Sequence, residues 1–242
     1  MSLALKLVLS PLLVAQALAT RRRALVLPEA DGARRGVIGQ GEPFRLLIVG
    51  DSSAAGVGVR TQAQALAGHL TRALAAGARR KVQWQLVARS GITTAQALEL
   101  VQAEPPDAAD VAVVVLGVND VIDQVPSQRA VAQRAALADW LLAHTQVRHV
   151  VFAPLPPMHR FPLLPQPLRR IMGSDARRHD DAMARWAAAR GDVSHVPIAF
   201  ELGPQHMAED GFHPGEPVYR NCGEALAGFI VEQLFNPEQT RA

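Results

Sequence analysis

Short apolar runs alternate with longer segments of helical periodicity from residue 45 onward, and this alternation constrains the fold more than any other feature of the sequence. Residues 46–49 and 111–116 are unbroken apolar runs, which is typical of strands buried on both faces of a sheet. We expect strands at 45–50, 82–88, 111–116, 147–153 and 193–198 and helices at 61–76, 93–103, 126–144, 174–190 and 215–235. Because helical crossovers join parallel strands, the pattern predicts an α/β fold with a parallel sheet between two helical layers.

The composition excludes several classes of protein. The chain has 242 residues, of which 49% are hydrophobic and 19% charged, so it can bury a sizeable core and is not disordered. Only 5% of the residues are aromatic, and the net charge is +3 with the arginines in small separate groups, so no nucleic-acid partner is expected. Cys222 is the one cysteine, which excludes an internal disulfide and a metal site built from several cysteines.

The first 43 residues differ in character from the rest of the chain. Residues 3–19 are mostly apolar, and three arginines follow at 21–23. The run is short and interrupted for a transmembrane helix, which leaves a secretory signal or a helix lying on a membrane surface as alternatives. The positive-inside rule favours membrane contact on the cytoplasmic side, and export to the periplasm is the other interpretation. Residues 28–43, rich in glycine and charge, are expected to form a linker before a globular domain at 44–242.

A small polar tripeptide, Gly50-Asp51-Ser52, directly follows the first expected strand. In open α/β sheets, ligands bind beyond the carboxyl ends of the strands, so a serine on a tight turn there is exposed and rigidly held. These are the properties that a nucleophilic serine requires. The alternative is an ordinary strand-to-loop turn, since glycine, aspartate and serine are all common turn residues.

Three further motifs follow strands or precede the last helix. Gly91 comes after the second expected strand, Asn119 follows the third, and the sequence from Asp210 to His213 leads into the last helix. A glycine backbone N–H and an asparagine amide, together with the N–H of Ser52, can form the oxyanion hole that acyl transfer needs. A short loop can place the carboxylate of Asp210 against one imidazole nitrogen of His213 and aim the other nitrogen at Ser52.

Taken together, these motifs resemble the four sequence blocks of the SGNH (GDSL-type) hydrolases over about residues 44–235. The resemblance implies a three-layer α/β/α, flavodoxin-like fold with strand order 2-1-3-4-5 and a catalytic domain at 44–242. It implies ester hydrolysis through an acyl-enzyme on Ser52, with His213 as base and Asp210 orienting it. Ser52 N–H, Gly91 N–H and the Asn119 side chain would form the oxyanion hole, and neither a cofactor nor a metal is implied. Ser53 departs from the family pattern, where a leucine usually stands.

The segment 154–173 interrupts the regular alternation with six prolines and several apolar residues. It leaves the fourth expected strand at its carboxyl end, so Phe161, Leu163 and Leu164 are candidates to line an acyl pocket or to form a lid. A long surface loop packed on the neighbouring helices is the alternative. The predicted substrate is a small-molecule or lipid-like ester. The rival hypotheses are a carbohydrate-ester deacetylase on the same fold and a catalytically silent, membrane-tethered binding module, and the sequence does not predict an oligomeric state.

Overall fold

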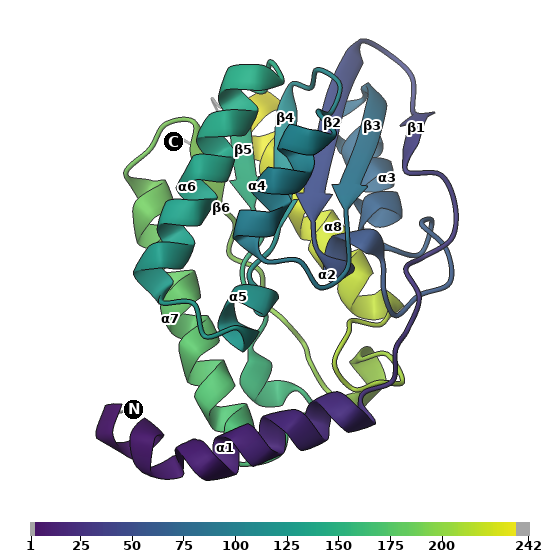
Figure 1. The fold of residues 1–242 in the computed structure, drawn as a ribbon. Coiled ribbons are helices and arrows are strands. Elements are labelled where there is room, and N and C mark those ends of the chain that lie inside the picture. Colours follow the sequence, from purple (N-terminus) through teal and green to yellow (C-terminus); the bar gives the residue numbers. More distant parts are fainter. Residues whose placement is uncertain (1–2, 236–242) are drawn as a thin grey trace.

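The computed structural model describes residues 3–235 and contains one sheet with the strand order β1-β3-β2-β4-β5-β6 (Figure 1). The strands are β1 (Arg35–Ile38), β2 (Pro43–Gly50), β3 (Lys81–Ala88), β4 (Val111–Val115), β5 (His149–Phe152) and β6 (Val193–His195). Strands β2 to β6 are parallel to one another, as their pairing registers show. In the numbering of the five expected strands their order is 2-1-3-4-5, and the predicted fold class is confirmed.

Helices cover both faces of the sheet, and the side chains of β2 show why. Leu46 and Ile48 pack in the core cluster on one face, and Leu47 and Val49 pack in the cluster on the other. Because successive side chains of a strand point to opposite faces, an unbroken apolar run needs a helical layer on each side. The first face is covered by α3 (Leu66–Ala78) and α8 (Glu216–Ile230), and the second by α4 (Thr94–Ala103), α6 (Ser127–His144) and α7 (Leu168–Ala188).

The expected linker at residues 28–43 is not a linker throughout, which corrects the sequence interpretation. Residues 35–38 form β1, which pairs antiparallel with β3 at the edge of the sheet. The strand is short and half-exposed, so it lacks the apolar alternation that identifies a buried strand. The preceding residues also make ordered contacts: Asp31 donates its N–H to the carbonyl of Arg60 at 2.9 Å and accepts one from Gln62 at 2.8 Å.

The proline-rich segment 154–173 is shorter as a loop than the sequence indicates. The 3₁₀ helix η1 (Met158–Arg160) lies within it, and α7 begins at Leu168 instead of the expected residue 174. Gly173 was expected to precede the helix but lies inside it. A larger residue would not fit there, because a β-carbon on residue 173 would come 2.5 Å from the β-carbon of His159. The glycine therefore lets η1 pack directly against α7.

Smaller elements complete the chain between the main layers. They are α2 (Ser52–Ala55), α5 (Val118–Ile122), the 3₁₀ helix η2 (Pro204–His206) and the π-helical turn η3 (Val231–Phe235), which extends α8. The helix α3 begins five residues after the expected start at Thr61, because residues 61 and 62 bond to the N-terminal segment instead. The last expected strand is also shorter, since it ends at His195, two residues before Pro197.

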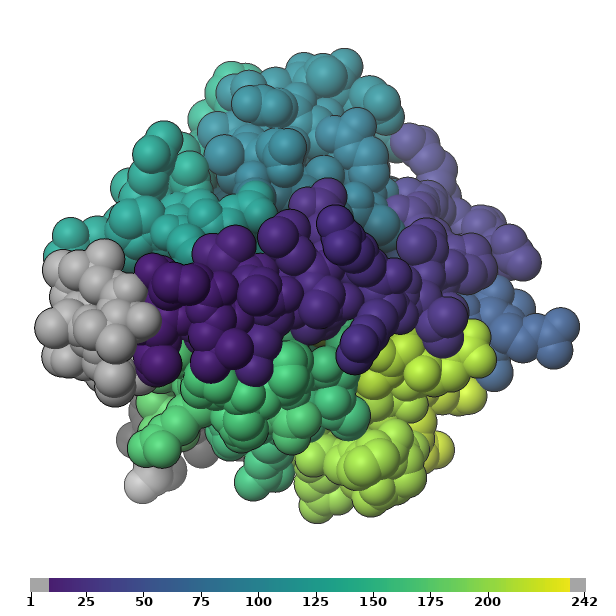
Figure 2. Space-filling view, turned by 60° about the horizontal axis from the view of Figure 1, so that its bottom comes forward, coloured from purple at the N-terminus to yellow at the C-terminus, as the bar shows by residue number. Residues whose placement is uncertain are grey.

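The helix α1 (Leu3–Arg23) runs across the end of the molecule at which β2 and β4 terminate (Figures 1 and 2). Leu13 packs against a cluster that includes Met158 and Phe161. The Gln16 side chain donates to the carbonyl of Gln166 at 2.7 Å and accepts from the N–H of Leu168 at 3.2 Å. Among the residues that the structure describes, no helix is both long and apolar enough to traverse a lipid bilayer.

Candidate active site

The strand register brings three of the sequence motifs to one edge of the sheet. Gly50, the last residue of β2, pairs with Ala88 of β3 on one side and with Val115 of β4 on the other. These three residues form a row across the sheet, and the motifs with Ser52, Gly91 and Asn119 begin within four residues beyond it. Adjacent strands lie about 4.8 Å apart, so the loops that follow them are immediate neighbours.

Ser52 begins the short helix α2, and Asp51 is the N-cap of that helix. The Asp51 carboxylate accepts the N–H of Ser53 at 2.9 Å, which fixes the turn that presents Ser52. Burial raises the pKa of Asp51 to about 7, despite the hydrogen bond from Ser53 and the attraction of His213. Asp51 is buried at 2% exposure and touches no open surface, so it serves the turn and is not a candidate nucleophile or base.

Asp210, His213 and Ser52 form a hydrogen-bonded chain. His213 Nδ1 lies 2.5 Å from Asp210 Oδ2, and His213 Nε2 lies 3.1 Å from Ser52 Oγ. The other carboxylate oxygen, Oδ1, accepts the N–H groups of Phe212 and His213, each at 2.9 Å. Burial alone would raise the pKa of Asp210, but the hydrogen bonds from the His213 side chain and these two N–H groups hold it below its ordinary value. Asp210 is therefore an anion at neutral pH that orients the imidazole toward Ser52.

The three candidate oxyanion donors differ in their hydrogen bonds. The backbone N–H groups of Ser52 and Gly91 have no partner within the described part of the chain, so both are available to a ligand. Gly91 has φ +79°, a conformation that other residues rarely adopt. The Asn119 amide donates to the carbonyl of Ile92 at 2.9 Å and to Asp51 Oδ2 at 3.3 Å. Its hydrogens are thus engaged, and the longer bond to Asp51 is the one that an oxyanion can most readily replace.

A buried ion pair between Asp120 and Arg134 lies next to these donors, and the sequence motifs did not reveal it. Asp120 accepts the N–H of Thr94 at 2.9 Å and its hydroxyl at 2.6 Å, which ties the loop after β3 to the loop after β4. Arg134 Nη2 lies 3.3 Å from Asp120 Oδ2, and both side chains are at most 1% exposed. The signal was present in α6, where Arg134 falls on the buried stripe with Ala130, Leu137 and Leu141. An arginine on such a stripe indicates a buried acidic partner.

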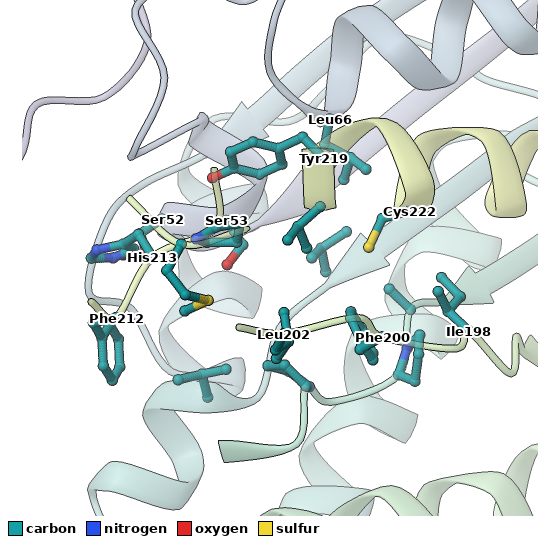
Figure 3. Close-up of a pocket in the computed structure, with 18 of the residues that line it drawn as sticks. Ser52, Ser53, Leu66, Ile198, Phe200, Leu202, Phe212, His213, Tyr219 and Cys222 are labelled. Atoms are coloured by element: carbon teal, nitrogen blue, oxygen red, sulfur yellow. Dashed lines mark hydrogen bonds between the residues drawn. The ribbon is translucent and has the colours of Figure 1, made fainter. Parts of the chain in front are cut away.

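An apolar pocket opens beside Ser52 and continues along α8 (Figure 3). Ser52 and His213 lie at one end of the labelled residues, and Cys222 and Ile198 lie at the other. The walls are mainly apolar and come from residues 198–202, the loop around Phe212 and the helix α8; they include Ile198, Phe200, Leu202, Met207, Val218 and Leu226. Burial raises the pKa of Cys222 to about 12, so its thiol is neutral at physiological pH and acts as part of the apolar wall.

The three predicted substrate-lining residues have different positions. Phe161 lines the pocket and packs edge-on against Phe212, with ring centroids 5.1 Å apart. Leu164 is 4% exposed and packs in the same core cluster as Leu155 and Phe161, but it is not among the residues that line the pocket. Leu163 is half-exposed, and its N–H donates to the carbonyl of Gly211 at 3.1 Å. Of the three predicted residues, only Phe161 lines the pocket.

Comparisons with known proteins find related sequences and similar folds. The chain is 29% identical over 214 residues to the GDSL-like esterase Rv1075c of Mycobacterium tuberculosis (strain ATCC 25618 / H37Rv); the match covers 81% of this chain and 66% of that relative. Its fold is similar to that of the lipase Lip_vut3 from a goat rumen metagenome, with a TM-score of 0.62, 18% identity and coverage of 77% and 98% of the two chains. It is also similar to Axe2, an acetylxylan esterase from Geobacillus stearothermophilus, with a TM-score of 0.54, 19% identity and coverage of 81% and 95%.

These structural similarities, at under one fifth identity, establish the fold alone. The family is identified by a family model, GDSL-like lipase/acylhydrolase, which matches residues 48–220, from β2 to the first turn of α8. The matched range contains Ser52, Gly91, Asn119, Asp210 and His213. The chain belongs to the GDSL-like lipase/acylhydrolase family.

Proposed function

We propose that this protein is a serine hydrolase that cleaves carboxylic esters through an acyl-enzyme on Ser52. The observation that carries the proposal is the chain of hydrogen bonds from Asp210 through His213 to Ser52 Oγ at the mouth of an apolar pocket. A nucleophile, a base and an orienting carboxylate are the three groups that activate a serine hydroxyl.

The geometry supports a two-step reaction. His213 Nε2 takes the proton of Ser52 as Oγ attacks the ester carbonyl, and the carbonyl oxygen becomes an oxyanion. The free N–H groups of Ser52 and Gly91, joined by the Asn119 amide, stabilise that charge. When the tetrahedral intermediate collapses, His213 returns the proton to the leaving alcohol and the acyl group stays on Ser52. Water, deprotonated by His213, then releases the acid and restores the serine.

The apolar pocket favours an ester with an alkyl acyl chain over a small acetyl ester. Each methylene that such a pocket buries contributes about 0.8 kcal/mol, which corresponds to roughly a fourfold gain in kcat/KM. We therefore expect kcat/KM for p-nitrophenyl esters to rise with acyl length from acetate upward, until the chain exceeds the pocket at Cys222. Steady-state hydrolysis of an ester series of increasing length measures this directly.

The same series separates the two rival functions. A carbohydrate-ester deacetylase would hydrolyse the acetate best and lose activity with every added methylene. A silent binding module would hydrolyse none of the esters and would not react with a fluorophosphonate. Either result would contradict the proposal.

We also propose that α1 contacts a lipid surface, with the catalytic domain on the cytoplasmic side. Support comes from apolar side chains that α1 and the residues after it expose to solvent: Leu12, Val14, Leu18, Leu25 and Val26 are between 47% and 98% exposed. The adjacent arginines 21–23 add positive charge that anionic headgroups attract. Sedimentation of the full chain with vesicles that contain or lack anionic lipid tests this contact. If all of the protein stays in the buffer with both kinds of vesicle, the proposal is wrong.

A further inference from the structure

The short segment between α1 and β1, residues 24–34, forms hydrogen bonds with the loop that carries Gly91. Glu29 Oε1 accepts both the N–H and the hydroxyl of Ser90, each at 2.7 Å. Arg34 donates to the other carboxylate oxygen of Glu29 and to the carbonyl of Ala88, the latter at 2.6 Å. One ion pair therefore holds the loop at two points, at the last residue of β3 and at the residue before Gly91.

Packing does not hold the first three residues of this loop, although Ile92 after them is buried. Arg89, Ser90 and Gly91 are all exposed, and a β-carbon built on Gly91 would meet no atom within 4 Å. The N–H of Gly91 belongs to the planar peptide unit that begins at the carbonyl of Ser90. Once Ser90 is fixed through its own N–H and hydroxyl, few dihedral angles remain to change the direction of that neighbouring N–H. The hydrogen bonds of Glu29 thus restrain this N–H from the Ser90 side, while the Asn119 amide holds the carbonyl of the buried Ile92 on the other side.

Glu29 is charged and is tied to the helix that carries the nucleophile. Burial would raise the pKa of Glu29, but the two hydrogen bonds from Ser90 and the charge of Arg34 hold it below its ordinary value. The next residue, Ala30, donates its N–H to the carbonyl of Ala55, the last residue of α2, at 3.2 Å. The buried Gln62 amide donates to the carbonyls of both Ala30 and Ala55, at 3.2 and 2.9 Å. The segment therefore links the helix that begins at Ser52 to the loop of Gly91.

We propose that Glu29, held by Arg34, is a positioning residue that keeps the N–H of Gly91 aimed as an oxyanion donor relative to Ser52. The inference rests on the proposed ester hydrolysis. Glu29 and Arg34 precede the range 48–220 that the family model matches, so this restraint comes from the N-terminal segment of this chain and not from the motifs of the family.

The test compares three substitutions at Glu29 in the full-length protein. Glu29→Ala removes the acceptor of Ser90, so kcat for a p-nitrophenyl ester should fall by roughly ten- to a hundredfold, somewhat less than the loss of a whole oxyanion donor. KM should stay within twofold, because the acyl pocket is untouched. Glu29→Gln keeps an oxygen acceptor for Ser90 but turns an NH2 group toward Arg34, so its kcat should lie between those of the wild type and Glu29→Ala. Glu29→Asp is one methylene too short to reach both Ser90 and Arg34 and should lose kcat, which gives a second reading if Glu29→Ala does not fold.

Glu42→Ala is the matched control, since Glu42 is a carboxylate between β1 and β2 that pairs with Arg80 away from the site. It should leave kcat unchanged. A boronic acid that mimics the oxyanion should lose affinity for Glu29→Ala in parallel with kcat. The inference is overturned if Glu29→Ala keeps its kcat within twofold of the wild type, if only KM changes, or if Glu29→Gln is as impaired as Glu29→Ala. Ser52→Ala separates this from the proposed function: if it stays fully active, ester hydrolysis on Ser52 is itself wrong.

Discussion

At the scale of single residues, the site combines groups that the sequence motifs identify with groups that they do not. Ser52, Asp210 and His213 were identifiable because each stands at a strand end or before a helix in a fixed order, and the structure brings their side chains into one hydrogen-bonded chain. Glu29 and Arg134 had no such motif. Glu29 contacts Ser90, 61 positions along the chain, and Arg134 contacts Asp120, 14 positions away. Local sequence patterns do not reveal such distant contacts.

Asn119 gives the sharpest residue-scale prediction. Asn119→Ala removes an amide donor and also the tie between Ile92 and Asp51, so kcat should fall by roughly two to three powers of ten with KM little changed. Gln102→Ala, which removes an exposed amide side chain of α4, is the control and should be neutral. Steady-state kinetics decides: a change in KM alone would mean that Asn119 binds substrate without stabilising the transition state.

Asp51 predicts a pH dependence of stability. Its pKa is raised by burial to about 7, whereas an unfolded aspartate titrates near 4, so its ionisation in the folded state is unfavourable. The stability it contributes is complete below about pH 4 and is lost as the pH rises through 7. In urea unfolding, the free energy of the wild type relative to Asp51→Asn should therefore decline between pH 5 and pH 8. A difference that is constant over this range would contradict the raised pKa.

At the scale of elements, the central strands were predictable and the edges were not. The apolar runs of β2 and β4 require burial on both faces, so their positions follow from sequence alone. The edge strand β1 is half-exposed and carries no such signal. The start of α7 was missed because Pro165, Pro167 and Gly173 suggest a loop, whereas Leu168, Ile171 and Met172 already form the buried stripe of the helix.

The helix α8 supplies the element-scale test of the acyl pocket. Cys222 and Leu226 extend the pocket wall one and two turns beyond Val218. Cys222→Phe should fill the far end, so hydrolysis of long-chain esters should fall at least tenfold while acetate hydrolysis is retained. Glu224→Phe places the same ring on the exposed side of α8 and should change neither. An equal loss for all chain lengths in Cys222→Phe would indicate a packing defect and no acyl site at this end.

In the segment after β5, we expect substitutions of Leu164 and Phe161 to have different effects. Leu164 lies in a core cluster and not in the pocket, so Leu164→Ser should lower stability and reduce activity alike for short and long esters. Phe161→Ala, at the pocket wall, should instead penalise long esters more than acetate. Thermal unfolding and the ester series together distinguish the two roles. If Leu164→Ser were selective against long esters, the pocket would extend further than the structure indicates.

At the scale of the whole molecule, the N-terminal segment has two separable parts. The helix α1 contacts the rest through Leu13 and Gln16, whereas residues 29–38 bind the active-site loops and the sheet. Removal of residues 1–24 should therefore leave a folded enzyme with nearly unchanged kcat but without affinity for anionic vesicles. Circular dichroism, ester hydrolysis and vesicle sedimentation measure the three properties. Vesicle binding that survives the truncation would place the lipid contact elsewhere.

The central claim is that Ser52, activated by His213, is the acylated residue. The most direct measurement is mass spectrometry of the full-length protein after reaction with a fluorophosphonate, with Ser52→Ala and Ser53→Ala compared in parallel. We predict one phosphonyl group on Ser52 in the wild type, the same label in Ser53→Ala, and no label in Ser52→Ala, with kcat lowered by several orders of magnitude in that variant alone. A label on Ser53, or full activity in Ser52→Ala, would contradict the account.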